Sequence, residues 1–547
     1  MNIRFKTGLD VGVDNLSKKS LAKNAAIIMI LTILSKILGF GRESLIAAKY
    51  GTSFSSDIYV FSYGITQMLF ASIGSSLSTT FIPMLSDYIE NKSFKERNYF
   101  VNNIINITVA IAIVLCILGI VFGKYVVLIF GPGFATKYSP ENFMEAITIT
   151  RIMFISLIFI AVQNVLTGVL QAHNEFAIPA SMSVFYNITI ITYLVLWGTT
   201  YGAKGLSIAI VIAFFVQMLI HIPKYKELGY KYSFVFDIKD DGIRKIMKLI
   251  VPVLIGASVS QINFLIDRSF ASNLGEGGIS TLNFANKLNM FVYGVFGVAI
   301  STVVYTSLSK FSAQNNEENY NQTLIESINI MNLIMIPATI GMIVLRHPLV
   351  DIVFKHGAFD ETSARLTAEV LLFYAPGILA YGIRDIINRA FYALQDTKTP
   401  MINSVIGLAI NIVLNAVLVK YMGITGLALA TTISAVTISL LLLFSFKRIR
   451  KISYKKISIS FVKIIVSSTI MGICVYLFNK VIVIHLGTSS ILKLLGLLLS
   501  TALGIIVYMF LIRIFKVEEY VYFIDKVKIK LKSSLLNILI MIKLKVI

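Results

Sequence analysis

Charged residues interrupt several long apolar stretches of this sequence, and they are the side chains best placed to do chemistry. An ionisable group inside an apolar span costs several kcal/mol unless it faces water, a partner or a ligand. These positions are therefore candidate binding groups rather than accidents of composition. They are Lys36, Arg42, Glu43, Asp57, Asp267, Arg268, Lys287, Arg384, Asp385 and Arg389.

Cations outnumber anions in this set, which favours a water-filled cavity of positive potential and an anionic ligand. The planar fork of arginine matches phosphate oxygens particularly well. Arg42 and Arg268 are the strongest candidates because they occupy corresponding places in two halves of the chain. Asp57 could equally form an ion pair between helices, and Arg384 and Arg389 could lie at a membrane interface. Asn263 could hydrogen-bond a ligand or join two helices.

No motif in the sequence calls for catalysis or a bound cofactor. Cys116 and Cys474 lie apart in apolar runs, so they predict neither a zinc site nor a disulfide framework. The 5 histidines are scattered, without metal-ligand spacing, and no GxxxxGK[ST] phosphate loop occurs. We therefore expect a non-enzymatic protein with no metal and no cofactor, apart from a coupling ion, Na⁺ or H⁺, that the sequence does not specify.

The elements that must position these charges follow from composition. Of 547 residues, 56% are hydrophobic and only 14% charged. A soluble enzyme or a nucleic-acid-binding module of this length needs far more polar surface. Because a membrane helix takes about 20 apolar residues, the runs predict an all-α polytopic membrane protein with fourteen transmembrane helices. The spans are 24–49, 57–86, 98–130, 141–171, 177–199, 205–222, 249–272, 279–308, 322–345, 362–392, 401–420, 425–446, 458–480 and 489–515.

The net charge of +21 mainly reports orientation. Counted over connections, tails and span ends, thirty Lys and Arg residues fall on one side of the predicted membrane and six on the other. The positive-inside bias makes the richer side cytoplasmic, together with both termini. The basic segments 222–248 and 447–456 either mark this topology or bind anionic lipid or a partner, and we favour the first interpretation.

The two halves of the chain resemble each other at a constant offset. Residues 172–179 parallel 393–400, and Gly202 and Gly205 map onto Gly423 and Gly426. An even six-helix repeat gives two pseudo-symmetric lobes in one orientation, with a pathway between them. The predicted parts are a basic tail (1–23), an N-lobe (24–222), a basic linker (223–248), a C-lobe (249–446), a basic loop (447–457), two extra helices (458–515) and an amphipathic tail (516–547).

Several segments resemble the MurJ/MviN lipid II flippases of the MOP exporter superfamily, from about residue 24 to 450. They are SKILGFGRESLIAAKYG (35–51) followed by Ser56-Asp57, FIPMLSDY (81–88), IDRSFASNLGEGGISTLNFANKLN (266–289) and FYALQDTKTP (391–400). The resemblance implies fourteen helices, two six-helix lobes around a cationic cavity, and an extra helix pair forming a lipid-tail groove. By the same resemblance, Arg42, Glu43, Asp57 and Lys287 match family positions, with Lys36 where some members have Arg.

The implied function is translocation of undecaprenyl-pyrophosphate-linked peptidoglycan precursor, lipid II, from the inner to the outer leaflet of the bacterial cytoplasmic membrane. We expect alternating access, driven by the membrane potential or an ion gradient, with lipid II, membrane lipids and cell-wall synthases as partners. Two departures leave room for another polyprenyl-linked saccharide of the capsule, teichoic-acid or O-antigen type. Phe70 stands where some members have Arg, and Val304-Tyr305-Thr306 lacks a usual Pro.

Two further function classes are disfavoured. A membrane glycosyltransferase or polymerase would need a large extramembrane loop with a carboxylate, and the longest outer loops, 123–140 and 346–361, are short. A multidrug exporter of cationic compounds would need acids to dominate its cavity, and the excess is basic.

Overall fold

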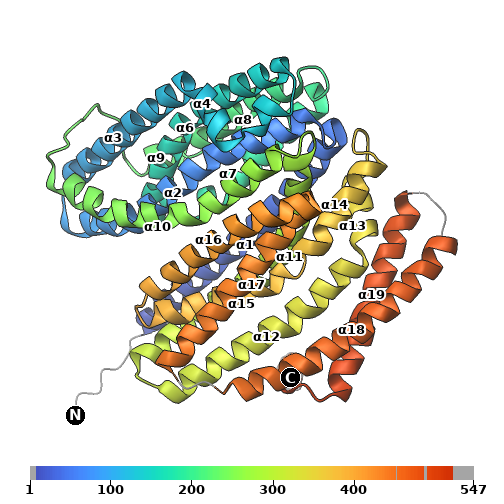
Figure 1. The fold of residues 1–547 in the computed structure, drawn as a ribbon. Coiled ribbons are helices and arrows are strands. Elements are labelled where there is room, and N and C mark those ends of the chain that lie inside the picture. The colour runs from blue at the N-terminus through green and yellow to red at the C-terminus, as the bar shows by residue number, and fades with distance from the viewer. Residues whose placement is uncertain (1–7, 451–452, 486–489, 521–547) are drawn as a thin grey trace, which may run out of the picture. The chain divides into compact units, whose positions relative to one another are not determined.

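The fold consists of helices throughout the part of the chain that the structure, a computed structural model, describes: residues 8–450, 453–485 and 490–520 (Figure 1). Within these ranges, side chains are described except at 8–26, 70–73, 75–78, 250–260, 483–485 and 490. The prediction of an all-α fold is confirmed. The calls on residues 1–7, 451–452 and 521–547, which include most of the predicted amphipathic tail, lie outside the described residues.

The chain divides into two compact units, of which the first comprises residues 1–280 and 356–363. Its long helices pair through apolar faces: α2 packs on α6 and α10, α1 on α7, and α6 on α3 and α8. The helices of this unit are α1 (Gly8–Tyr50), α2 (Phe54–Asn91), α3 (Phe94–Val121), α4 (Gly123–Phe130), α5 (Gly133–Thr136), α6 (Pro140–Ala172), α7 (Ala177–Trp197), α8 (Gly202–Leu219), α9 (Ile222–Glu227) and α10 (Asp241–Ser272).

The second unit comprises residues 281–355 and 364–547. Here α16 packs on α17, α15 on α12 and α17, and α18 on α12 and α19. Its helices are α11 (Gly278–Ala313), α12 (Glu317–Val344), α13 (Arg346–Phe354), α14 (Glu361–Tyr374), α15 (Gly377–Ala393), α16 (Lys398–Met422), α17 (Ile424–Ile449), α18 (Tyr454–His485) and α19 (Ser490–Ile514). The first turns of α11 and α14 belong to the first unit.

Each of the fourteen predicted spans falls on a helix or on a consecutive helix pair. Among the described residues, 10 helices are long and apolar enough to cross a membrane, and the bent pair α14–α15 would make 11. The charge-bearing helices α1, α2 and α10 do not meet that measure within the described residues. The chain is thus a multi-pass membrane protein, and the count of fourteen stays a prediction.

Two predicted spans are broken where the backbone cannot continue a helix. The span 98–130 divides at Phe122 into α3 and α4. The span 362–392 divides before Pro376 into α14 and α15, which meet at 40°. Proline lacks an N–H and disfavours a helical conformation in the preceding residue, so a bend at this point follows from the sequence.

The sequence repeat is visible in backbone geometry. Asn174 ends α6 with φ +60°, and Gln395 ends α15 with φ +61°. Both turns close with the same bond, from Glu175 N to Leu170 O (2.9 Å) and from Asp396 N to Phe391 O (3.0 Å). This is the Schellman pattern of a helix C-terminus. Gly202 and Gly423 are likewise left-handed, with φ +54° and +58°.

The helix α10 opens the predicted C-lobe, yet it belongs to the first compact unit because it packs along α2. The compact units therefore do not coincide with the halves of the sequence repeat. The packing within each unit does not show whether the two halves of the repeat form two lobes. The predicted domain limits therefore remain predictions.

Candidate functional site

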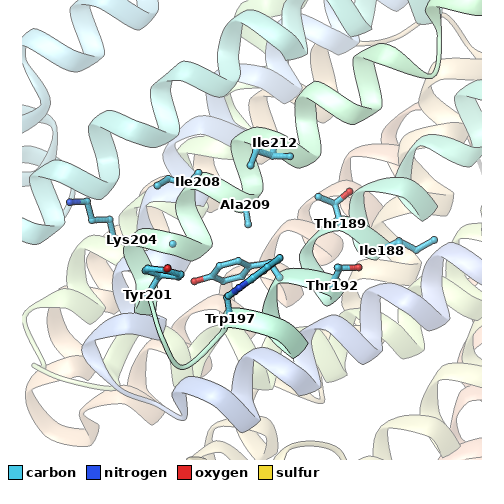
Figure 2. Close-up of a pocket in the computed structure, with 11 residues that line it drawn as sticks. Ile188, Thr189, Thr192, Trp197, Tyr201, Lys204, Ile208, Ala209 and Ile212 are labelled. Atoms are coloured by element: carbon cyan, nitrogen blue, oxygen red, sulfur yellow. The ribbon is translucent and has the colours of Figure 1, made fainter.

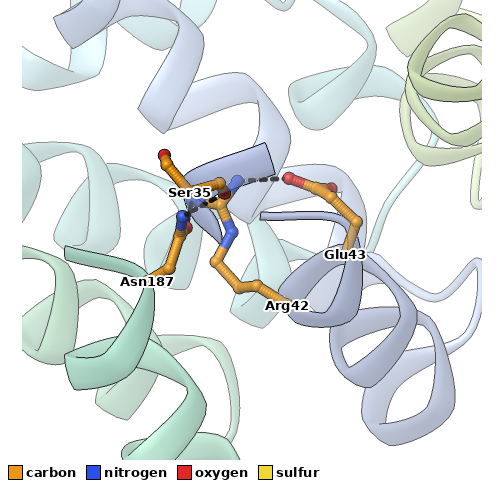
Figure 3. A network of polar contacts seen from close by, with 4 residues as sticks. All are labelled: Ser35, Arg42, Glu43 and Asn187. Atoms are coloured by element: carbon orange, nitrogen blue, oxygen red, sulfur yellow. Dashed lines mark hydrogen bonds and ion pairs between the residues drawn. The ribbon is translucent and has the colours of Figure 1, made fainter. Parts of the chain in front are cut away.

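A buried cation of the first unit, Arg42, lies on the face of α1 that packs against α7. Its guanidinium forms an ion pair with Glu43 and donates from Nη1 to Asn187 Oδ1 at 3.0 Å (Figure 3). Asn187 in turn donates to the carbonyl of Ser35 at 3.1 Å. The Arg42 guanidinium also lies 5.3 Å from the ring centre of Tyr186. We call these five residues the Arg42 cluster.

Burial of this cluster is nearly complete, with 7% of Arg42 and 3% of Glu43 exposed. A guanidinium has five N–H donors, more than Glu43 and Asn187 use. The cation is therefore held by the protein and still able to donate to a further oxygen.

A cavity of about 320 Å³ opens at Arg42, between α1, α2, α6, α7 and α8. Apart from the arginine, its polar lining consists of neutral groups that can donate or accept hydrogen bonds. The polar lining residues are Ser35, Tyr63, Gln67, Gln163, Ser183, Tyr186, Asn187 and Gln217. No carboxylate lines this cavity. It combines one positive charge with amides and hydroxyls, which suits a phosphate or a sugar better than a cation.

Arg268 lies against the same turn of α2. Its guanidinium covers Gly64, where an added Cβ would come within 1.3 Å of Arg268 Nη1. Gly64 directly follows Tyr63, which lines the Arg42 cavity. Within this turn of α2, Tyr63 therefore lines the cavity at Arg42, and Gly64 lies against the guanidinium of Arg268. This supports the expectation that the two arginines belong to one region.

Asp57 occupies a different kind of site, at the start of α2. Its carboxylate is fully buried and accepts from Tyr138 Oη, Gly277 N and Ser280 N, each at 2.7 Å. The two backbone donors belong to the first turn of α11 and the residue before it, so Asp57 caps a helix other than its own. Three of the roughly four acceptor positions of this carboxylate are thus occupied by donors of the protein.

Three more candidates lie in the first unit without joining the Arg42 cluster. Lys36 is exposed and does not line the cavity, because Ser35, Gly39 and Arg42 form the cavity face of α1. Asp267 is buried on α10, with 7% exposed. Asn263 is half-buried on the same helix.

Lys287, Arg384 and Arg389 belong to the second unit and are half-buried. On α15, the Arg384 guanidinium lies 5.2 Å from the ring centre of Tyr381. Asp385 accepts from Tyr293 Oη at 2.5 Å. We call Tyr293, Tyr381, Arg384, Asp385 and Arg389 the α15 cluster.

The larger cavity of the first unit contains none of the predicted site residues. It measures about 720 Å³ and lies between α7 and α8, with Trp197, Tyr201 and several aliphatic side chains around it (Figure 2). Lys204 is its one charged lining residue. Size alone therefore does not identify the functional site, because the charges that need a ligand lie elsewhere.

Sequence reasoning missed the partners of its own candidates. Asn187 and Tyr186 were not singled out, nor was Tyr138, and none of them stands in a charged motif. The sequence does contain a signal at Gly64, because a glycine inside an apolar helix often allows another group to approach the helix backbone closely. Among the described residues, no group of three His, Cys, Asp or Glu side chains could hold a metal ion.

Comparison with known proteins places these features in a family. Residues 46–495 match the family model described as "Lipid II flippase MurJ". The "Probable lipid II flippase MurJ" of Buchnera aphidicola subsp. Acyrthosiphon pisum is 29% identical over 83% of this chain and 89% of its own length. The "Lipid II flippase MurJ" of Burkholderia cenocepacia is 27% identical over 76% of this chain and 82% of its own.

Solved structures agree. "Lipid II flippase MurJ, inward closed conformation" is 30% identical, covers 90% of this chain and 98% of its own, and superposes with a TM-score of 0.77. A multidrug-resistance MATE transporter of the MOP superfamily, in an inward-facing conformation, shares the fold at 16% identity, with a TM-score of 0.62 over 78% of this chain and 98% of its own. The chain therefore belongs to the lipid II flippase MurJ family.

Proposed function

We propose that this protein is a flippase that moves lipid II, an undecaprenyl-pyrophosphate-linked peptidoglycan precursor, from the inner to the outer leaflet of the bacterial cytoplasmic membrane. Family membership supports the transport class and the substrate. The structural observation that carries the proposal is the buried Arg42, which faces a cavity lined by neutral polar groups.

In this proposal Arg42 binds the diphosphate. Glu43 and Asn187 orient the guanidinium before the substrate arrives, so little side-chain entropy is lost on binding. A charged phosphate oxygen forms a stronger hydrogen bond than a neutral amide, so it can compete for the donors that Asn187 occupies. The glutamines and the two serines of the cavity offer hydrogen bonds to sugar hydroxyls.

A cavity of about 320 Å³ accommodates a diphosphate and part of a sugar, but not the complete headgroup of a peptidoglycan precursor. The remaining contacts come, in the proposal, from Arg268, Lys287, Lys36 and the other predicted cations. The polyprenyl tail stays in lipid, along α18 and α19. Alternating access of the site to the two leaflets then exposes the headgroup outside.

The energy source proposed is the membrane potential or an ion gradient, together with consumption of lipid II outside. One elementary charge crossing 100 mV corresponds to about 2.3 kcal/mol. The orientation proposed places both termini in the cytoplasm. It agrees with the bond from Lys231 N to Asn98 Oδ1, which joins the linker predicted to be cytoplasmic to the start of the span 98–130. Cell-wall synthases that use lipid II are the proposed protein partners.

The test is a flipping assay in liposomes that contain the purified protein and labelled lipid II. Because Arg42→Ala would leave Glu43 as a buried, unbalanced acid, the decisive variant is the double change Arg42→Gln and Glu43→Gln, which removes both charges at similar volume. We expect it to fold and to lose flipping. Lys92→Ala, at an exposed end of α2, is the control and should transport normally.

Two results would contradict the proposal. Normal flipping by the folded double variant would remove Arg42 from substrate binding. Flipping of a capsule-type or teichoic-acid-type polyprenyl saccharide, with no flipping of lipid II, would instead support the alternative that Phe70 suggests. The side chain of Phe70 lies outside the described ones.

A further inference from the structure

The connection between α9 and α10 contains an extended segment whose apolar side chains have no protein cover. Residues 231–238 adopt neither helix nor strand, and six of these eight residues are exposed, the four apolar even-numbered ones among them. Tyr232 is 64% exposed, Phe234 79%, Phe236 48% and Ile238 60%. Successive side chains of an extended backbone point to opposite sides, so these four share one face.

The opposite face is bound to α3 by asparagine side chains. Asn102 Nδ2 donates to Lys231 O at 2.9 Å, Asn106 Nδ2 to Val235 O at 2.9 Å, and Asn103 Nδ2 to Asp237 O at 2.8 Å. In return, Lys231 N donates to Asn98 Oδ1 and Asp237 N to Asn103 Oδ1. The odd-numbered residues of the segment thus satisfy their backbone on α3 while the even-numbered residues point away.

The segment is fixed at both ends as well. Tyr230 is buried, stacks on Tyr225 with ring centres 5.2 Å apart, and shares a hydrogen bond with His173. At the other end, Asp240 caps α10 by accepting from Ile243 N at 3.0 Å. Because the backbone is bound to α3 and fixed at both ends, these contacts hold the four apolar side chains in their exposed positions.

The position of the asparagines gives the depth of the segment. α3 is one of the helices able to cross a membrane, and it begins at Phe94. Asn106 lies twelve residues further on, which is about 18 Å along the helix axis at 1.5 Å per residue. The turn of the segment near Val235 therefore lies about three helical turns past the start of α3.

We propose that residues 231–238 form a shallow hairpin that inserts into the membrane leaflet at this end of the first unit, with Phe234 and Phe236 among the lipid chains. Irregular backbone near a membrane needs partners for its polar groups, and the asparagines of α3 supply them at Lys231, Ser233, Val235 and Asp237. Lys231 and Lys239 flank the hairpin and are exposed, as expected for contact with lipid phosphates. Asp237 is turned toward α3, where its carboxylate accepts from Tyr99 Oη.

Tryptophan fluorescence in proteoliposomes tests the position of the hairpin. The full chain has 1 tryptophan, so Trp197→Phe gives a background without emission. Phe234→Trp is then compared with Lys226→Trp, at an exposed position of α9, and with Ile117→Trp, at an exposed position near the middle of the predicted span 98–130. The vesicles contain lipids brominated at shallow or deep positions of the acyl chains.

We expect shallow bromines to quench Phe234→Trp at least about threefold more than Lys226→Trp, as interfacial insertion requires. Deep bromines should act mainly on Ile117→Trp. Equal, weak bromine quenching of Phe234→Trp and Lys226→Trp, with full access to aqueous acrylamide, would overturn the proposal. Shielding from acrylamide without bromine quenching would also overturn it and would point to a protein contact, such as a second copy of the chain.

Discussion

The Arg42 cluster and the α15 cluster both contain arginine, an acid and tyrosine, but the positive charge of the arginine is stabilised differently in each cluster. Arg42 is enclosed, with 7% exposed, and is held by Glu43 and Asn187. Arg384, Asp385 and Arg389 are half-buried, and the two arginines lie over the tyrosine rings of Tyr381 and Tyr305. A buried charge needs a fixed counter-charge, whereas a half-exposed one retains water.

The difference in enclosure should translate into a difference in stability. Arg42→Ala leaves Glu43 buried without its nearest cation, so we expect a loss of about 3–5 kcal/mol in the free energy of unfolding. Arg384→Ala removes a ring contact worth about 1 kcal/mol. Thermal unfolding in detergent, measured side by side, checks this contrast. Equal losses would mean that the Arg42 pair is solvated in the membrane-embedded protein.

Asp57 extends the comparison to an acid held by donors alone. In Asp57→Asn, one side-chain oxygen becomes an NH₂ group facing N–H donors, so we expect a loss of about 2–3 kcal/mol. Tyr138→Phe removes only one of the three bonds and should cost about half as much. Denaturation of both variants gives the ratio. A neutral effect of Asp57→Asn would show that the carboxylate is already protonated.

Gly64→Ala tests the position of Arg268 without changing any charge. The new methyl group must displace the end of a flexible side chain, which costs little stability. If Arg268 contacts substrate, flipping should fall about tenfold, equivalent to about 1.4 kcal/mol. Gly341→Ala, on α12 with nothing within 4 Å of the new Cβ, is the matched control. Unchanged flipping in Gly64→Ala would separate Arg268 from the Arg42 site.

Asp385→Asn should be mild. The amide oxygen can still accept from Tyr293 Oη, and the half-exposed site leaves water for the NH₂ group, so we expect a change of about 1 kcal/mol or less. Thermal unfolding measured against Asp57→Asn provides the comparison. A loss as large as that of Asp57→Asn would show that the α15 cluster is enclosed too.

The smallest effect concerns an exposed acid outside the spans. Hydrogen bonds from the Ser363 backbone hold the pKa of Asp360 below its usual value. A lowered folded pKa stabilises the folded state above the unfolded pKa of about 4, and this contribution disappears as pH falls through the lower folded value. Asp360→Asn should therefore lower the stability slightly near neutral pH, leave it nearly unchanged at a pH below the lowered pKa, and so flatten the acid limb of the stability profile.

Much of the fold could be predicted because hydrophobic runs are local. Each predicted span lies on a helix, and the offset between the halves reappears in the left-handed turns at Asn174 and Gln395. The packing of α10 on α2 could not be predicted, since many apolar faces are interchangeable in sequence. For the candidate site, Arg42, Glu43 and Asp57 could be singled out from the sequence, but not the groups that hold them, such as Asn187 at Arg42 and Gly277 N at Asp57.

The sequence by itself determined that the chain is helical, spans a membrane and carries unusual cations, because composition, run length and charge are properties of neighbouring residues. It also determined the repeat and the family. Only the tertiary structure decided which oxygens and amides meet those cations. Asn187 reaches Arg42 from 145 positions along the chain, and Gly277 reaches Asp57 from 220. Contacts between residues so far apart depend on helix packing, and no local pattern encodes them.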